Sequence, residues 1–311
     1  MQLEQHHALH LVLDEALRYG PSYTRQGLRL SSHLPMRLTA LARLGADAAQ
    51  LQAQLRQGAA RLEPTGALRA GLDLDALLPR LLLQAPEAMA FHGAIRMAYA
   101  LDAGHAGEQA AALDAWLAGA VPAPVDTSQA DGSLSLRDTL DRVRADPALA
   151  MQLRIGTTIM SDLQVAQRLP GFSAYLALPR LSLEALAEAS LAAYLAGRDF
   201  TALHLVTGVH ALRVLLAHVR KRGLTVDEGQ VLRGLWRAWL AAYVAIERPA
   251  LPWALVHAGT ASEADWQAQL PALHRSGDEH RIKLADTARE EWRLRGWPGY
   301  ALCLQAAAAA A

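Results

Sequence analysis

The stretch SGDEHRIKLADTARE, residues 276–290, holds two residues whose types and spacing suggest chemistry, His280 and Lys283. Ser276 and Glu279 match the S-x-x-E capping box, which predicts a helix that begins just after Ser276, near the next glycine. His280 and Lys283 then lie three residues apart on one face of its first turns. Burial and the positive end of a helix dipole both lower the pKa of a lysine.

A lysine with a lowered pKa offers chemistry that arginine lacks. Its neutral amine can act as a base, form a Schiff base, or take up carbon dioxide to become a carbamate, which is an anionic oxygen ligand for a metal. Nearly all of the 30 basic residues in the chain are arginines, and Lys221 and Lys283 are its two lysines. The alternative is a surface lysine whose stem packs on the helix and whose ammonium pairs with Asp286 or Glu279.

Three more of the twelve histidines stand in apolar, helix-like surroundings. His33 precedes the apolar run LPM, and His204 lies in the long apolar segment FTALHLVTGVHALR. His92 is predicted in the middle of a helix, on one face with Arg96 and Tyr99. Burying a neutral imidazole needs a compensating partner, so each of these positions is a candidate for a functional role. The alternative for each is a helix cap or a core histidine with one hydrogen bond.

Composition excludes several classes of protein. A net charge of zero predicts no binding to nucleic acid or to an anionic membrane. No apolar run is long enough to predict a membrane span, and the N-terminus lacks the pattern of a signal peptide. Cys303 is the only cysteine, which fits a reducing compartment and predicts a cytoplasmic protein. No G-x-G-x-x-G, Walker, hydrolase-elbow or zinc-cluster motif occurs. NADPH stays open as a co-substrate, although no Rossmann motif is present.

The elements that must position these residues are predicted to be helices, because Ala and Leu dominate the chain and β-branched residues are sparse. The spacing of apolar residues and the positions of Gly and Pro predict helices over 2–19, 31–46, 47–60, 86–104, 108–119, 181–197, 200–223 and 226–249. A linker is predicted at 121–133 and a frayed alanine tail at 306–311. The predicted fold is all-α: residues 1–311 form one large bundle-like domain with a histidine-lined central pocket.

Four segments, taken in order, resemble the questin oxidase-like family. "SHLPMRLTALARLGAD" resembles its N-H-L-P-M…A-L-x-x-L-G-A signature, and "FHGAIRMAYAL" its F-H-x-x-I-R-x-x-Y-A segment. "LHLVTGVHALR" is similar to its H-x-V-T-x-x-H-A segment, and "DEHRIKLADTA" to its D-x-H-x-x-K segment. Together they run from about residue 30 to 290. Ser32 departs from the family's usual asparagine, which removes any hydrogen bond from that amide but leaves the histidine.

The resemblance implies an oxygenase of polyketide or anthraquinone-type aromatic substrates, acting by ring opening or Baeyer–Villiger-like oxygen insertion. Both iron-dependent and cofactor-independent chemistry have been proposed in this family. Carried over by position, the functional residues are His33, His92, His204, His280 and Lys283, with His210 as a further candidate.

The favoured hypothesis is a non-haem iron oxygenase. The four histidines His33, His92, His204 and His280 would hold Fe(II) in a bundle core, and a carbamylated Lys283 would supply an anionic oxygen. Arg96 or Tyr99, one turn from His92, would orient the oxygen of an aromatic substrate that reacts with dioxygen. Three tryptophans suit either a pocket for a flat aromatic or the core: Trp236, Trp239 and Trp253.

Two alternatives remain from the sequence. A histidine could act as a general base in a metal-free pocket, with the substrate carbanion reacting directly with dioxygen. The chain could instead be a helical binding protein whose histidines are scattered. The sequence leaves open whether His210 or His257 replaces a named ligand, and it does not indicate the substrate, the reductant or the oligomeric state.

Overall fold

The computed structural model describes residues 3–25, 27–64, 71–121, 132–151 and 158–305. Most of the predicted linker (122–131) and the whole of the alanine tail (306–311) lie outside these residues. The described residues are almost entirely helical, with one small antiparallel hairpin, so the predicted all-α fold is confirmed.

The hairpin pairs β1 with β2, and Tyr23 faces Leu30 across it. The bounds of the α-helices and strands are α1 (Leu3–Ala16), β1 (Ser22–Arg25), β2 (Leu28–Ser31), α2 (Leu34–Arg43), α3 (Ala48–Ala59), α4 (Leu74–Gln84), α5 (His92–Ala103), α6 (Ala106–Gly119), α7 (Leu136–Ala145), α8 (Ile159–Gln167), α9 (Leu183–Gly197), α10 (Phe200–Lys221), α11 (Glu228–Ala245), α12 (Trp253–His257), α13 (Glu263–Arg275), α14 (Glu279–Arg295) and α15 (Gly299–Gln305). Two short 3-10 helices are Pro147–Leu149 and Phe172–Tyr175.

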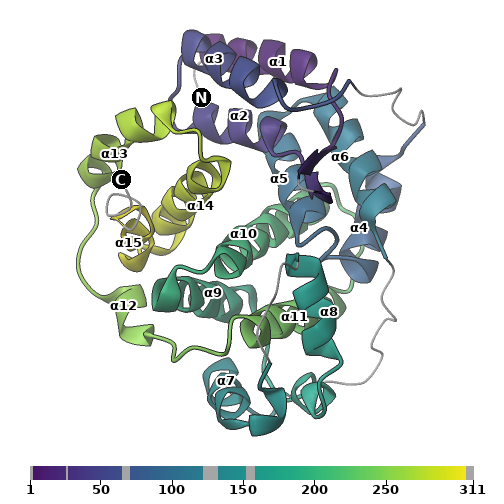
Figure 1. The fold of residues 1–311 in the computed structure, drawn as a ribbon, viewed down its shortest axis with the longest axis vertical. Coiled ribbons are helices and arrows are strands. Elements are labelled where there is room, and N and C mark those ends of the chain that lie inside the picture. The colour runs from purple at the N-terminus through teal and green to yellow at the C-terminus, as the bar shows by residue number, and fades with distance from the viewer. Residues whose placement is uncertain (1–2, 26, 65–70, 122–131, 152–157, 306–311) are drawn as a thin grey trace.

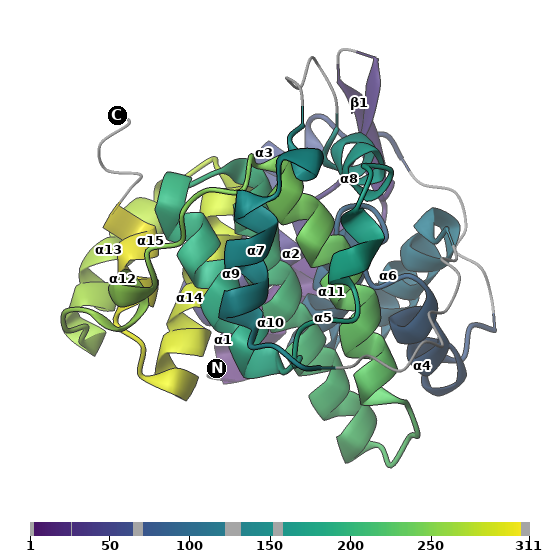
Figure 2. The ribbon, with the colours of Figure 1, turned by 90° about the horizontal axis from the view of Figure 1, so that it is seen from below.

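Helix α10 runs through the middle of the molecule and packs against α5, α9, α11 and α14 (Figure 1). Helix α2 in turn packs against α5 and α14. The helices α2, α5, α10 and α14 therefore form a closed ring of neighbours, although they come from distant parts of the chain. The hairpin stands at one edge of the molecule (Figure 2).

Helix α10 is long and apolar enough to cross a membrane by length and composition alone. In the fold, 78% of its most apolar 18-residue window is buried. That burial is what the central helix of a packed bundle requires, because such a helix must be apolar on every side.

The predicted helix 86–104 is wrong in its first turn. Helix α5 begins at His92, because Met89, Ala90 and Phe91 have φ values of 55°, 56° and 68°. These left-handed conformations are costly for residues with a side chain, and local propensity does not favour them. Tertiary packing holds them, because Phe91 packs directly on Gly208. A Cβ on Gly208 would lie only 3.0 Å from Phe91 Cγ. Gly208 of α10 thus makes room for Phe91 and not for a ligand.

The predicted capping box of α14 is also wrong. Helix α14 begins at Glu279, and its N-cap is Asp278, whose carboxylate accepts hydrogen bonds from the backbone N–H groups of His280 and Arg281. The Ser276 hydroxyl only accepts from the Asp278 N–H. Asp is as good an N-cap as Ser, so the helix starts two residues later than the motif predicts. Glu279 is thereby left free for other contacts.

Helix α2 begins later than predicted in the same way. Its N-cap is His33, whose side chain makes no capping hydrogen bond, although the sequence pattern predicts a helix start at residue 31. Pro35 stands in the first turn, where its missing N–H costs nothing. The His33 imidazole is therefore free to point away from its own helix.

The close packing of α5 against α6 gives a testable consequence for stability. A Cβ on Gly93 would lie 2.6 Å from Trp116 Cδ1 in α6. Gly93→Ala should therefore lower the free energy of unfolding by about 1–3 kcal/mol, measured by urea denaturation. Gly197→Ala is the matched control, because nothing lies within 4 Å of its Cβ position and alanine favours the helix. Equal stability of the two variants would contradict the tight α5–α6 contact.

Candidate metal and substrate site

Each helix of the ring contributes one histidine to the same place. His33 is the N-cap of α2, His92 is the first residue of α5, and His280 is the second residue of α14. His204 lies one turn into α10. Three of the four side chains thus project from helix N-termini, where the chain can deliver a side chain into the space between helices.

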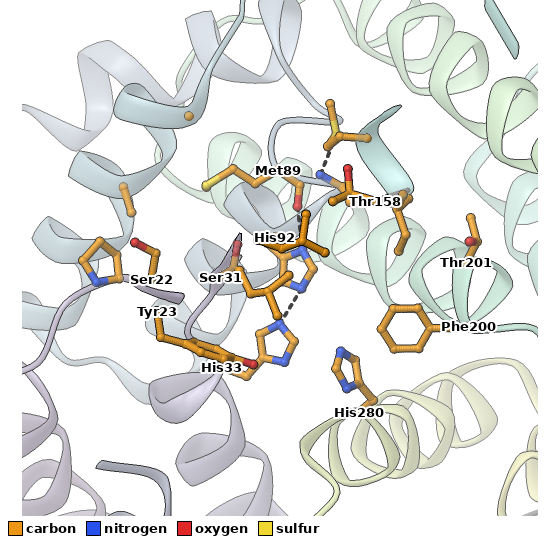
Figure 3. Close-up of a pocket in the computed structure, with 18 of the residues that line it drawn as sticks. Ser22, Tyr23, Ser31, His33, Met89, His92, Thr158, Phe200, Thr201 and His280 are labelled. Atoms are coloured by element: carbon orange, nitrogen blue, oxygen red, sulfur yellow. Dashed lines mark hydrogen bonds between the residues drawn. The ribbon is translucent and has the colours of Figure 1, made fainter. Parts of the chain in front are cut away.

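The four imidazoles are in mutual contact, as Figure 3 shows for the three that line the cavity. The His33 and His92 rings stack with centroids 4.5 Å apart, and the His280 ring meets His33 edge-on at 4.4 Å. The His204 centroid lies 4.9 Å from that of His92 and 5.4 Å from that of His280. Ligand nitrogens of His33, His92 and His280 all lie within 4.8 Å of one another.

The Nδ1 atoms turn outward to oxygen atoms. His92 Nδ1 lies 2.6 Å from the Met89 carbonyl, and His204 Nδ1 lies 2.8 Å from the Phe200 carbonyl. Because a carbonyl only accepts, both Nδ1 atoms carry the proton of the neutral ring. His33 Nδ1 lies 3.2 Å from Glu279 Oε1, which is ion-pair distance without the alignment of a hydrogen bond.

The Nε2 atoms turn inward. His204 Nε2 and His280 Nε2 are buried without a partner. His33 Nε2 and His92 Nε2 lie 2.6 Å apart, at hydrogen-bond distance. Because His92 carries its proton on Nδ1, its Nε2 accepts this hydrogen bond and His33 Nε2–H donates it. A metal ion at this point would take the place of the shared proton.

A metal ion fits the donor set of His33, His92 and His280, the group of candidate metal ligands, which does not include His204. Two imidazole nitrogens bound cis to one ion at ~2.1 Å would lie about 3 Å apart, close to the observed separation. Histidines that ligate metals usually donate their other N–H to a carbonyl or carboxylate, as His92 and His204 do here. Imidazole nitrogens suit iron, copper, zinc or nickel and not calcium or magnesium.

Burial keeps the histidines neutral. Desolvation, followed by the positive charge of Lys283, lowers the pKa of His33 and of His280 well below the ordinary value. The same two effects lower the pKa of His204 to about 3. For His92, desolvation and the neighbouring His33 and His204 are the largest causes of a strongly lowered pKa. Neutral imidazoles are the form that binds metals.

Lys283 lies behind the histidines, one turn after His280, and is 1% exposed. Burial lowers the pKa of its ammonium to about 8, while the charges of Glu279 and Asp278 raise it. Its charge lowers the pKa of all four histidines. A buried amine with a lowered pKa has a larger neutral fraction near neutral pH than an ordinary lysine, and carbamate formation requires the neutral amine.

A cavity of about 670 Å³ opens directly on the histidines. This volume suits a drug-sized ligand, and most of its wall is apolar. In Figure 3, Tyr23 of the hairpin and Phe200 of α10 flank the histidines as its aromatic walls. Ser31, Thr158 and Thr201 are polar residues in this lining. The sequence prediction missed this wall, because the hairpin has no distinctive motif.

Arg96 and Tyr99 are not brought to the cavity. The Arg96 guanidinium donates two hydrogen bonds to the Glu108 carboxylate, at 2.6 and 2.9 Å. The Tyr99 hydroxyl donates to the Lys283 carbonyl at 3.3 Å, and burial is the main cause of its raised pKa. Arg96 thus fixes α5 to α6, and Tyr99 fixes α5 to the turn of α14 that carries Lys283.

His210 and His257 also lie outside the cluster. His210 Nδ1 lies 2.7 Å from Glu291 Oε1, beside Arg213. His257 Nε2 lies 3.0 Å from Glu188 on the surface. Neither residue joins the group of candidate metal ligands found among the described residues.

Of the two roles considered for the three tryptophans, the structure supports packing in the core and not lining a substrate pocket. Trp236 and Trp239 are completely buried and stack on each other, and their N–H groups donate to the Tyr175 carbonyl and the Ser190 hydroxyl. Trp253 packs against the Arg137 guanidinium. None of the three lines the cavity.

Comparison with known proteins agrees with the sequence resemblance. The model of a family described as questin oxidase-like matches residues 79–288, more than half of the chain. The matched range includes His92, His204, His280 and Lys283. His33 precedes it, yet the structure places His33 in contact with His92. No curated protein matches the chain at a significant level.

The Glu291 network supplies a prediction about pH and stability. Burial alone would raise the pKa of Glu291, but His210, Arg213 and Arg295 outweigh it and hold the pKa well below the ordinary value. A carboxyl with a lowered pKa stabilises the fold above its unfolded pKa, and that stability is lost as the pH falls below about 4.5. At pH 7, Glu291→Gln should cost about 3–5 kcal/mol, because buried charges lose their partner.

The cost should shrink when urea unfolding is repeated at pH 3.5. Glu290→Gln is the control, since Glu290 is more exposed and its interaction with Arg43 is shared with two aspartates. A pH-independent cost of Glu291→Gln would contradict the assigned charge on Glu291.

Proposed function

Because the chain belongs to the questin oxidase-like family and is therefore an oxidase or oxygenase, we propose that it is a non-haem iron enzyme. Its substrate would be an aromatic polyketide or anthraquinone-like molecule. The reaction would cleave a ring or insert oxygen in the manner of a Baeyer–Villiger oxidation. The observation that carries the proposal is the inward orientation of four Nε2 atoms. It leaves His204 Nε2 and His280 Nε2 buried with no hydrogen-bond partner, beside the His33–His92 pair.

His33, His92, His204 and His280 would hold Fe(II), and Lys283 would supply an anionic oxygen as a carbamate. When bound, iron supplies the activation of dioxygen that an organic side chain cannot. Carbamate formation joins the neutral Lys283 Nζ to the carbon of carbon dioxide and releases one proton. The helix dipoles at the N-termini of α2, α5 and α14 favour the resulting anion over an ammonium.

The cavity residues would bind and orient the substrate. A planar aromatic placed between Tyr23 and Phe200 would present one edge to the histidines. The apolar wall would exclude bulk water, which strengthens electrostatic interactions at the reacting atoms. Incorporation of both atoms of dioxygen balances without a reductant, whereas incorporation of one atom would require two electrons from a donor such as NADPH.

The cofactor-independent alternative has one observation in its favour. His280 lines the cavity, and its Nε2 is free to accept a proton. Its basicity argues against the alternative, since burial and the charge of Lys283 lower the pKa far below neutrality. A general base works best when its pKa lies near the working pH. The metal proposal therefore accounts better for the same residues.

We also propose a cytoplasmic location. The single cysteine, Cys303, is buried and unpaired, so the chain carries no internal disulfide that an oxidising compartment would favour.

The first test is the metal content of the purified protein by elemental analysis. About one iron per chain is expected in the wild type, with strong loss in His92→Ala and Lys283→Ala, since each removes a ligand. Lys221→Ala and His257→Ala are matched controls on exposed residues and should retain iron. Full iron in Lys283→Ala would remove Lys283 from the ligand set. No metal in the wild type would favour the histidine-base mechanism.

The second test is dioxygen consumption with a hydroxyanthraquinone after exhaustive chelation. Activity should disappear on chelation and return with Fe(II) but not with Zn(II), because zinc has no redox chemistry. Turnover that survives complete metal removal would sink the iron proposal.

A further inference from the structure

Glu279 joins the histidine cluster to a charged residue outside it. Its Oε1 lies 3.2 Å from His33 Nδ1, and its Oε2 accepts a hydrogen bond from Arg61 Nη2 at 2.6 Å. Glu279 is the first residue of α14, directly before His280, and is 7% exposed. Arg61 follows α3 and is half-exposed. The two carboxylate oxygens therefore face different residues, one toward the cluster and one toward the surface.

Arg61 also contacts the wall of the cavity. Its guanidinium carbon lies 5.3 Å from the centroid of the Tyr23 ring, a cation–π arrangement. Tyr23 lines the cavity from strand β1, and in Figure 3 it lies beside His33. The contacts form a chain that runs Tyr23–Arg61–Glu279–His33.

The backbone links the same two regions by a second route. The residues before β1 are fixed to the Arg61 segment, because the Gly20 N–H donates to the Glu63 carbonyl at 2.9 Å and Tyr19 forms a β-bridge with Pro64. Strand β2 ends at Ser31, only two residues before His33. A displacement of the hairpin therefore reaches His33 through the chain and through the side chains.

We propose that Glu279 and Arg61 are a positioning pair for His33. The pair sets the orientation and tautomer of that imidazole and connects it to cavity occupancy through Tyr23. The inference rests on the proposed function, because it takes His33 as a metal ligand. A carboxylate beside Nδ1 would hold the proton there and free the Nε2 lone pair for the metal, in place of the hydrogen bond to His92. Arg61 holds this carboxylate in place and compensates its burial.

A purely structural ion pair between α14 and the segment after α3 is the competing explanation. It predicts that loss of Glu279 lowers the melting temperature without changing the affinity for metal. A positioning pair predicts instead that loss of Glu279 weakens metal binding. Mutating the outer partner of a metal-bound histidine typically lowers metal affinity by roughly 10–100-fold. The two explanations are separated by measuring both quantities on the same variants.

The experiment is calorimetric titration of the full-length, metal-free protein with Co(II), beside thermal denaturation of the same samples. Glu279→Gln and Arg61→Gln should bind Co(II) roughly 10-fold or more weakly than the wild type. Glu279→Asp should recover part of the loss, since it restores a carboxylate. Arg56→Gln is the matched control, because Arg56 is an exposed arginine on the preceding helix, and it should bind as the wild type does.

A second titration tests the connection to the cavity with anthraquinone-2-sulfonate, which lacks the peri hydroxyl groups that would chelate free metal. The probe should tighten Co(II) binding roughly fivefold in the wild type. The effect should persist in Tyr23→Phe, which keeps the ring over Arg61, and vanish in Tyr23→Leu and Arg61→Gln. An equal effect in all four proteins would overturn the connection through Tyr23.

The outcomes distinguish this inference from the proposed function. A wild type that binds no Co(II) would remove the metal site itself, and a wild type that does not bind the probe would remove the proposed substrate class. Wild-type binding that is unchanged in Glu279→Gln overturns the positioning pair alone. A lowered melting temperature at unchanged Co(II) affinity also overturns it, in favour of the structural ion pair.

Discussion

Four neutral imidazoles packed together, two of them without a hydrogen-bond partner for the inner nitrogen, form the constraint on which the site depends. A buried polar nitrogen without a partner is unfavourable. Three of the rings are held from outside, by a carbonyl at His92 and at His204 and by a carboxylate near His33. The packing of α2, α5, α10 and α14 around this point keeps the four rings together.

The use of helix N-termini creates an electrostatic problem that the buried lysine can solve. The positive ends of α2, α5 and α14 disfavour any cation near the cluster, whether an ammonium or a metal ion. Four neutral ligands add no compensating charge. A carbamate on Lys283 would replace a buried positive charge by a negative one, which improves the interaction with the dipoles and with a metal at once. Arginine at this position could not do so.

Sequence patterns predicted many of the helices, and the family resemblance supplied the histidines of the cluster, but neither predicted the geometry that orders it. His280 and Lys283 were placed on one face of a helix start by their spacing alone. His92 was misplaced in mid-helix, since the left-handed turn at Met89–Phe91 depends on Phe91 packing against Gly208 more than a hundred residues away. The roles considered for Arg96 and Tyr99 assumed that facing His92 means facing the ligand. Glu108 and the Lys283 carbonyl take up those side chains instead.

The two sides of the cavity differ in how they are built, and this divides their tasks. The histidines stand on helices that share the central core, where His204 and Lys283 are almost wholly buried. The opposite wall includes a two-stranded hairpin at the edge of the molecule, and a hairpin has little stability of its own. Rigid helices can hold ligand atoms to fractions of an ångström, whereas an edge hairpin can change shape or sequence at little cost. Under the proposed function, the helix ring would carry the reactivity, and the wall with Tyr23 would select the substrate.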